Sequence, residues 1–159
     1  MIEQNLTLTD AIHVAMEAEA AAAAFYTHAA TKTATLGHDL LEQLAAFERY
    51  HYDLLTKLEQ SLRDHGTFIE YEGKEFTVPI LSQVPTDKQP DKMSMMGIIT
   101  TALDIEARAE EGYTALATKT NDAAGKAMFK RLAQEEHKHH QILKEAYVSL
   151  NQNGTWVWP

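Results

Sequence analysis

The sequence predicts an all-α protein, a four-helix bundle made of two similar helical hairpins joined by a long crossover linker. Three observations support this prediction. Apolar residues recur every three or four positions in four long segments, and Gly, Pro and cap residues separate the segments. The second pair of segments also repeats the pattern of the first. We expect a single domain over residues 1–159.

The first helix is expected over residues 9–36. Thr7 and Asp10 have the spacing of a capping box, in which each side chain bonds the backbone N–H of the other residue. Glycine commonly follows the last residue of a helix, so Gly37 marks the expected end. Because few residues remain before the next helix, the two helices are expected to form an antiparallel hairpin.

The remaining helices are expected over residues 39–65, 95–120 and 123–150. Gly66 ends the second helix, and Ser94, a good N-cap residue, precedes the third. The third and fourth helices are again joined by a few residues. This short connection predicts a second antiparallel hairpin.

The linker between the hairpins runs from about residue 66 to residue 93 and holds three of the four prolines. A connection this long is uncommon in a compact domain unless it has a function, and an extended chain of this size can reach along a whole bundle. Residues 68–71 and 75–78 flank Gly73, a pattern that favours a small β-hairpin. Residues 151–159 form a C-terminal tail with two tryptophans.

The two hairpins share one pattern of residues. A shift of 87 residues relates the first and third helices, and a shift of 88 relates the second and fourth. The repeat includes polar residues on the apolar stripes, where side chains are expected to face the core. These residues are Glu19, Tyr26, Glu48, His51, Glu106, Tyr113, Glu136 and His139.

Four carboxylates and two imidazoles are therefore expected to face the core at mid-helix. Isolated buried charges are costly, and no Lys or Arg lies on these stripes to pair with them. Two divalent cations would balance the four negative charges. Glu and His three residues apart share one helix face, so both can reach the same ion. The predicted metal ligands are Glu19, Glu48, His51, Glu106, Glu136 and His139.

Mixed oxygen and imidazole ligation is typical of iron or manganese, so the expected cofactor is a pair of iron ions (Fe2+/Fe3+) or of manganese ions, with zinc substitution possible. A single Glu-x-x-His in a helix is usually an ordinary surface pair. Here two such pairs, two further glutamates and the repeat agree, which favours a metal site. Tyr26 and Tyr113 have two interpretations: core tyrosines, or hydroxyls that hydrogen-bond a ligating carboxylate and support catalysis.

Composition and charge exclude several classes of function. The chain has 14 basic and 23 acidic residues, and its net charge of -9 would repel nucleic acid and anionic membranes. The absence of cysteine rules out disulfides, zinc–thiolate sites, iron–sulfur clusters and thiol nucleophiles. The N-terminal residues lack the basic and apolar regions of a signal peptide, so we expect a cytoplasmic protein without a membrane partner.

The combined motifs resemble those of the rubrerythrin-like branch of the ferritin-like superfamily. The matching segments are 19–26, 44–51, 106–113 and 132–139, within residues 8–150. The resemblance implies a ferritin-like four-helix bundle with a di-iron centre. It also implies reduction of hydrogen peroxide or dioxygen with electrons from a donor protein.

The sequence departs from these families at three points. Rubrerythrins carry a rubredoxin-like iron site made of cysteines, so this chain needs an external electron donor. They also have a carboxylate three residues after the third-helix glutamate, where this chain has Ala109, and Glu110 lies one position further round the helix. Bacterioferritins share the six-ligand pattern, but the methionine that holds their haem is Arg49 here.

The main functional prediction is a di-iron oxidoreductase that uses peroxide or dioxygen as oxidant. Three alternatives remain: a ferroxidase that stores or handles iron, a non-catalytic metal-binding or sensing module, and an oxygenase of an organic substrate. We also expect a homodimer or a larger homo-oligomer. The first helix is rich in alanine on every face, and tail tryptophans are expected to dock on a neighbour.

Overall fold

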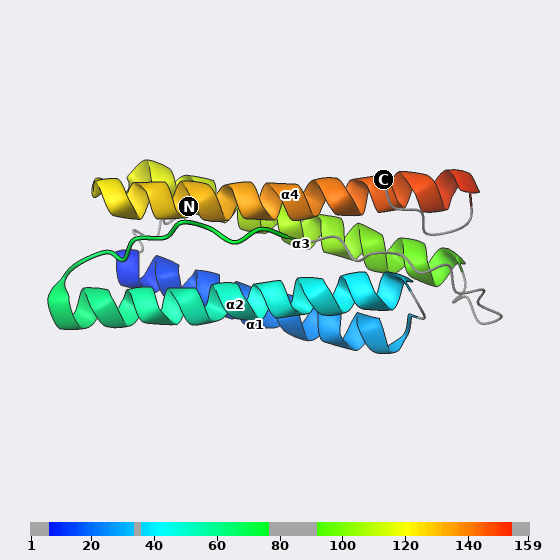
Figure 1. Ribbon diagram of the computed structural model, residues 1–159, viewed down its shortest axis with the longest axis horizontal. Coiled ribbons are helices and arrows are strands. Elements are labelled where there is room, and N and C mark those ends of the chain that lie inside the picture. The colour runs from blue at the N-terminus through cyan, green and yellow to red at the C-terminus, as the bar shows by residue number, and fades with distance from the viewer. Residues whose placement is uncertain (1–6, 34–35, 77–91, 154–159) are drawn as a thin grey trace, which may run out of the picture.

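The computed structural model describes residues 7–33, 36–76 and 92–153. Within these residues it contains no strand and four helices, which are α1 (Leu8–Thr31), α2 (Leu36–His65), α3 (Lys92–Lys119) and α4 (Ala123–Asn153). α1 packs along α2 and α3 packs along α4, and the two hairpins lie on each other (Figure 1). The predicted all-α bundle of two hairpins is confirmed. None of the described helices is long and apolar enough to cross a membrane.

The helix ends show local capping interactions. At the start of α1, the Asp10 N–H donates to the Thr7 hydroxyl at 3.1 Å and the Thr7 N–H donates to the Asp10 carboxylate at 3.2 Å, which confirms the capping box. α2 ends before Gly66, whose φ of 67° lies in the left-handed region that favours glycine. At the start of α4, Asp122 accepts the N–H of Gly125 at 2.9 Å.

The predicted boundary between the first two helices is wrong. α1 ends at Thr31 instead of residue 36, and Gly37 lies buried in the first turn of α2. The carbonyl of Ala30 is bonded by the Thr33 hydroxyl at 3.2 Å and by His38 Nδ1 at 2.7 Å. These side chains bond a carbonyl in the last turn of α1 that has no partner within the helix. The helix therefore ends before the position that Gly37 predicts.

The predicted start of the third helix is also wrong by one turn. α3 begins at Lys92, so Ser94 lies inside the helix and does not cap it. Serine favours the N-cap position but does not exclude an interior one, so the residue type alone misplaced the boundary. The linker between residues 77 and 91 and the tail from residue 154 lie outside the described residues.

The described part of the linker, residues 67–76, is an extended segment that we call the strap. It runs between α2 and α4 and is the green segment without helix in Figure 1. No strand forms within it, so the predicted β-hairpin is wrong for residues 68–71 and 75–76, while residues 77 and 78 lie outside the described part. The strap residues bond to the bundle instead of to each other, as the site below shows.

Phe68 anchors the start of the strap on α4. Its ring meets Phe129 edge to face, with 6.3 Å between ring centroids. Gly125 makes room for this contact, because a Cβ there would lie within 2.9 Å of the Phe68 ring. The strap is thus held against the helical hairpin that follows it in the chain.

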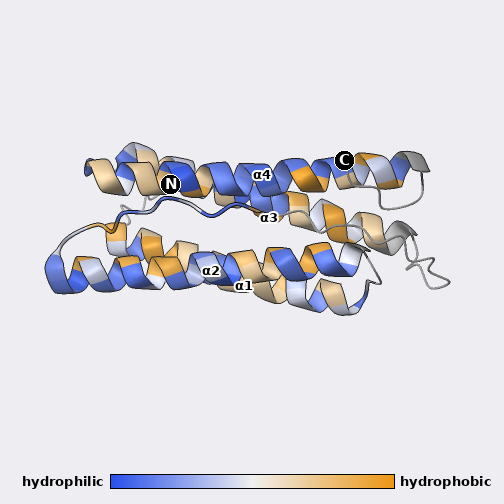
Figure 2. Cartoon of the chain, in the orientation of Figure 1, coloured by the Kyte–Doolittle hydropathy of each residue, from blue (hydrophilic) through white to orange (hydrophobic). Residues whose placement is uncertain are grey.

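Two apolar clusters fill the bundle on either side of a polar layer. One cluster includes Leu44, Ile99 and Leu143, and the other includes Leu58 and Phe129, all fully buried. Figure 2 shows hydrophilic residues along the middle of the strap, after its apolar start, and in the middle of α4. The polar layer between the clusters contains the predicted metal ligands.

Candidate metal centre

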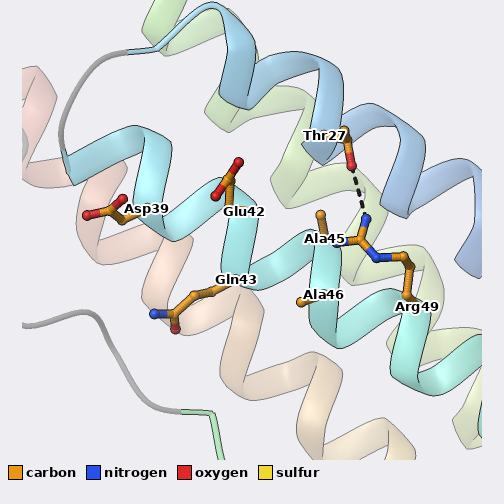
Figure 3. A pocket seen from close by; sticks show the side chains of 7 residues that line it. All are labelled: Thr27, Asp39, Glu42, Gln43, Ala45, Ala46 and Arg49. Carbon is orange, nitrogen blue, oxygen red and sulfur yellow. Dashed lines mark hydrogen bonds between the residues drawn. The ribbon is translucent and has the colours of Figure 1, made fainter.

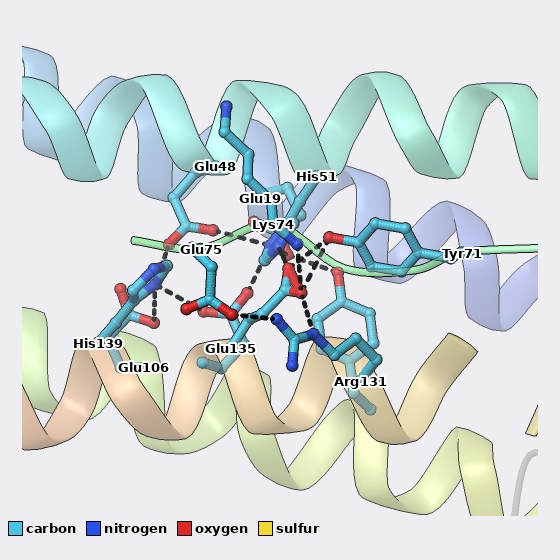
Figure 4. A network of polar contacts seen from close by, with 12 residues as sticks. Glu19, Glu48, His51, Tyr71, Lys74, Glu75, Glu106, Arg131, Glu135 and His139 are labelled. Carbon is cyan, nitrogen blue, oxygen red and sulfur yellow. Dashed lines mark hydrogen bonds and ion pairs between the residues drawn. The ribbon is translucent and has the colours of Figure 1, made fainter. Parts of the chain in front are cut away.

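All four helices contribute to the polar layer, and none of the six predicted ligands exposes more than 3% of its surface. The side chains converge between the hairpins, as Figure 4 shows for most of them. Their positions are Glu19 on α1, Glu48 and His51 on α2, Glu106 on α3, and Glu136 and His139 on α4.

The six residues form two overlapping groups, in each of which the ligand atoms lie within 4.8 Å of one another. The groups are Glu19, Glu48, His51 and Glu136, and Glu48, Glu106, Glu136 and His139. Glu48 and Glu136 belong to both, so these two carboxylates are placed to bridge a pair of ions. Each ion position then has one histidine and one further glutamate of its own.

Each buried tyrosine bonds a glutamate of the other hairpin. Tyr26 on α1 donates to Glu106 on α3 at 2.6 Å, and Tyr113 on α3 donates to Glu19 on α1 at 2.5 Å. The bonds cross between the hairpins because α1 and α3 run antiparallel beside each other (Figure 1). A catalytic role for the two tyrosines stays a prediction.

In the absence of a cation, the four carboxyl groups cannot all ionise at neutral pH. Burial, followed by the charges of Glu106, Glu136 and Glu19, raises the pKa of Glu48 well above its ordinary value. Burial and the charges of Glu106 and Glu19 raise the pKa of Glu136 to about 8. Burial also opposes ionisation of Glu106, but a hydrogen bond with Glu136 and the charge of His139 outweigh it and lower its pKa to about 2. The two shared carboxyls therefore carry protons that a metal ion must displace.

At the two histidines, burial and the neighbouring carboxylates have opposite effects on the pKa. Burial lowers the pKa of His51, but the charge of Glu136 and hydrogen bonds to neighbouring carboxylates outweigh it, so the pKa lies well above its ordinary value. At His139 burial is outweighed in the same way, mainly by Glu106. The cluster therefore holds protons on its imidazoles as well, and metal binding must release them.

Several buried polar atoms of the cluster have no hydrogen-bond partner within the described residues. They include both carboxylate oxygens of Glu48, one oxygen each of Glu106 and Glu136, and both ring nitrogens of His139. Buried polar groups are nearly always satisfied, so such a concentration of unpaired carboxyl and imidazole atoms is typical of a cation site. Carboxylate and imidazole donors suit iron or manganese. The donor set fits two divalent ions, and the role of each residue as a ligand stays a prediction.

A further buried carboxylate, Glu135, lies beside the cluster and was not predicted from the sequence. It exposes 4% of its surface. It accepts hydrogen bonds from His51 Nε2 at 3.1 Å, from the Tyr71 hydroxyl at 2.5 Å and from Arg131 Nε at 3.1 Å. The backbone N–H of Lys74 adds a bond at 3.3 Å. Glu135 thus joins the strap to a predicted metal ligand (Figure 4).

The sequence held one signal for Glu135. The residue lies one position away from the apolar stripe of α4, which favours a surface location. A shift of 88 places it opposite Phe47, however, so the internal repeat pairs a carboxylate with an aromatic ring at this point. The repeat is therefore not kept at the position just before the repeated glutamates, where the two hairpins carry different residue types.

Glu110 does not replace the missing carboxylate at Ala109. Its carboxylate pairs with His137 Nδ1 at 3.0 Å on the outside of the bundle. It belongs to neither group of candidate ligands among the described residues. The cluster therefore consists of the six residues that the repeat predicts.

A cavity of about 180 Å³ lies beside His139, under the strap. Phe47, Phe76 and Glu135 line it, together with charged side chains near its mouth. A separate surface groove of about 530 Å³ contains none of the candidate ligands (Figure 3). Arg49 lies in this groove and donates to the Thr27 hydroxyl at 3.2 Å.

The fold and the cluster together define a ferritin-like carboxylate bundle, in which two helices supply one Glu each and two supply Glu-x-x-His. Residues 97–157 match the family model of Rubrerythrin. This match confirms the resemblance over residues 97–157, which carry Glu106, Glu136 and His139.

A hypothetical protein from Pyrococcus furiosus is similar in structure, with a TM-score of 0.73 and 23% sequence identity. The similarity covers 94% of this chain and 94% of the other. At this level of identity, the comparison shows the fold alone. No curated protein matched the sequence.

Proposed function

We propose that the protein is a non-haem di-iron oxidoreductase of the rubrerythrin type, which reduces hydrogen peroxide or dioxygen with electrons from an external donor protein. The observation that carries the proposal is the pair of buried ligand groups that share Glu48 and Glu136. Glu48 and Glu136 would be shared by two ions, and a pair of redox metals would supply the two electrons of the reaction. The family match to residues 97–157 supports iron as the metal, with manganese as the alternative.

When bound, two Fe2+ ions supply the two electrons that convert one peroxide and two protons into two waters. The chain's own residues orient the ligands and exclude water. Tyr26 and Tyr113 hold one oxygen of Glu106 and of Glu19, which leaves the other oxygen of each carboxylate for an ion. The apolar clusters on both sides keep the layer dry, which strengthens its electrostatic interactions.

The cavity beside His139 supports a small oxidant. At about 180 Å³ it has room for peroxide, dioxygen and a few waters, and it is smaller than the pockets that usually hold organic ligands. This size disfavours an oxygenase of a large substrate. The 159 residues hold no cysteine for a second redox centre, which supports an external electron donor.

Anaerobic loading with Fe2+ followed by hydrogen peroxide tests the proposal. We expect two irons per chain, oxidation of both by one peroxide, and turnover when a reductant is added. Retention of many more irons per chain would favour storage. Two bound metals that do not react with peroxide or dioxygen would favour a structural or sensing role. A Glu48→Ala variant, which removes a shared carboxylate, is the control for metal content.

The assembly is also a proposal, for a homodimer or a larger homo-oligomer. α1 exposes Val14 at 54% of its surface, and Ala18, Ala21 and Ala24 are exposed along the same helix. The tail tryptophans lie outside the described residues. Light scattering coupled to size-exclusion chromatography measures the mass, and a monodisperse monomer would contradict this expectation.

A further inference from the structure

The two histidines of the candidate centre occupy equivalent positions in the internal repeat but have different neighbours. A shift of 88 relates His51 to His139 and Phe47 to Glu135. Each of the last two residues contacts the histidine of the opposite hairpin. Glu135 bonds the ring of His51, and Phe47 packs on the ring of His139.

The ring of His51 is held at both nitrogens. Nδ1 faces the carboxylates of Glu136 at 2.8 Å and Glu19 at 3.3 Å, on the side of the ligand cluster. Nε2 lies 3.1 Å from Glu135. Because a carboxylate only accepts, Nε2 carries a hydrogen toward Glu135. When a metal displaces the proton on Nδ1, Glu135 keeps the hydrogen on Nε2 and the Nδ1 lone pair becomes available to the ion.

Glu135 is itself held rigidly. The Tyr71 hydroxyl bonds both of its oxygens, at 2.5 and 2.9 Å, and Arg131 Nε donates to one of them at 3.1 Å. From the strap, the backbone N–H of Lys74 also donates to Glu135, at 3.3 Å. A carboxylate fixed in this way sets the rotation of the His51 ring before any metal binds, and it selects the Nε2–H tautomer once Nδ1 gives up its proton to metal binding.

The ring of His139 lacks this support. Its Nδ1 lies 3.4 Å from Glu48 and 3.5 Å from Glu106, but Nε2 has no hydrogen-bond partner among the described residues. Phe47 and Phe76 meet the ring edge to face, with centroids at 4.5 and 5.0 Å. Aromatic rings restrict the position of an imidazole but do not select its tautomer or raise its basicity.

We infer that Glu135 is a positioning residue that makes the two metal positions unequal, so that the His51 position binds iron more tightly than the His139 position. The inference rests on the dinuclear centre of the proposed function. The His139 position is then the weaker one, and it is also the one beside the cavity. A carboxylate behind a ligating histidine typically contributes a factor of about ten to a hundred in metal affinity.

Anaerobic titration of the full chain with Fe2+, followed by calorimetry, tests the inference. We expect two binding steps of different affinity in the wild type. Glu135→Gln should weaken the tighter step by about tenfold to a hundredfold and change the weaker step less than about threefold. Equal weakening of both steps, or an effect on the weaker step alone, would overturn the inference.

Tyr71→Phe separates positioning of His51 from anchoring of the strap. This variant removes a strap bond to Glu135 but keeps the bond between Glu135 and His51. Arg131 Nε and the Lys74 N–H still hold Glu135 in this variant, so both binding steps should stay within about threefold of the wild type. If Tyr71→Phe weakens iron binding as much as Glu135→Gln, the role of Glu135 is to anchor the strap and the inference is wrong.

Mössbauer spectra of the wild type give a readout that needs no variant. One equivalent of 57Fe2+ should give one quadrupole doublet, and a second equivalent should add a different one. Two doublets of equal area at one equivalent would contradict unequal positions. A wild type that binds no iron would contradict the dinuclear centre and this inference with it, whereas two irons in indistinguishable positions would contradict this inference alone.

Discussion

The hydroxyl of Tyr26 donates a 2.6 Å hydrogen bond to Glu106, so a residue of the first hairpin orients a predicted metal ligand of the second. Tyr113 makes the equivalent bond to Glu19 in the other direction. Neither hairpin completes the surroundings of its own glutamate. Correct packing of α1 on α3 is therefore a condition for the geometry of the metal centre.

Removal of either hydroxyl should weaken metal binding without unfolding the protein. In Tyr26→Phe the ring still fills its buried site, but Glu106 loses a hydrogen bond that orients it. We expect the affinity of Tyr26→Phe for Fe2+ to fall about tenfold. Tyr113→Phe should lose affinity to the same extent, because Glu19 loses the equivalent hydrogen bond. Anaerobic metal titration measures the effect, with circular dichroism to confirm the helices.

Tyr52→Phe is the matched control for both variants. Tyr52 exposes 37% of its surface and lies outside the candidate cluster. Its metal affinity should equal that of the wild type. An equal loss in all three variants would mean that the hydroxyls of Tyr26 and Tyr113 do not act on the ligands.

Sequence periodicity was sufficient for the bundle and for the six clustered residues, because a carboxylate on an apolar stripe must face the core. It did not show that Glu48 and Glu136 are shared, since this depends on how the two hairpins are rotated against each other. It also missed Glu135, whose burial depends on Tyr71 and the strap. A segment distant in sequence creates that environment, and no local pattern reports it.

The metal-free protein should become less stable as the pH rises. The pKa of Glu136 increases on folding from about 4.5 to about 8, so between these values the folded state holds a proton that the unfolded state has released. His51 and His139 also have raised pKa values. Their contribution is complete below pH 6.5 and declines from there as the pH rises toward their folded-state pKa values. Thermal unfolding in chelator should therefore give a lower Tm at pH 8 than at pH 5.5.

Metal binding should have the opposite pH dependence. The protons on Glu136, Glu48 and the two histidines must leave when ions bind, so the apparent affinity for Fe2+ should increase from pH 6 to pH 8. A pH indicator in weakly buffered solution measures the released protons. Binding without proton release at pH 7 would show that these groups are already ionised in the metal-free protein.

A substitution that abolishes metal binding should stabilise the metal-free fold. Glu48 is buried among three other carboxylates, and both of its oxygens lack a hydrogen-bond partner within the described part of the chain. Glu48→Gln removes the charge at nearly constant shape. We expect the free energy of unfolding in chelator at pH 8 to rise by about 1–3 kcal/mol, while iron binding falls below two per chain.

The comparison that tests this result is Glu42→Gln, which removes an exposed carboxylate on the same helix. Its stability should stay within about 0.5 kcal/mol of the wild type. If Glu48→Gln destabilises the metal-free protein, the four buried carboxyl groups are not under electrostatic strain. Urea unfolding in chelator measures the free energy of unfolding of the wild type, Glu48→Gln and Glu42→Gln.

Gly73→Ala should detach the strap from α4. Gly73 has a φ of 97°, and a Cβ there would overlap the guanidinium of Arg131, which bonds Glu135 and Glu75. We expect faster hydrogen exchange over residues 67–76 and a loss of about 1–3 kcal/mol in stability. Gly66→Ala is the control, since Gly66 also has a positive φ but open space around it, and only about 1 kcal/mol should be lost. Similar exchange rates in both variants would show that contact with Arg131 does not hold the strap.

The internal repeat has a consequence for how this kind of centre can evolve. An assembly of two identical hairpins is bound by its symmetry to place the same amino acid behind both histidines, and every mutation there acts twice. Once both hairpins belong to one gene, the codons for residues 47 and 135 change independently, as Phe47 and Glu135 already show. Because both halves belong to one chain, a substitution at one of these positions changes one side of the shared centre and leaves the other side as it was.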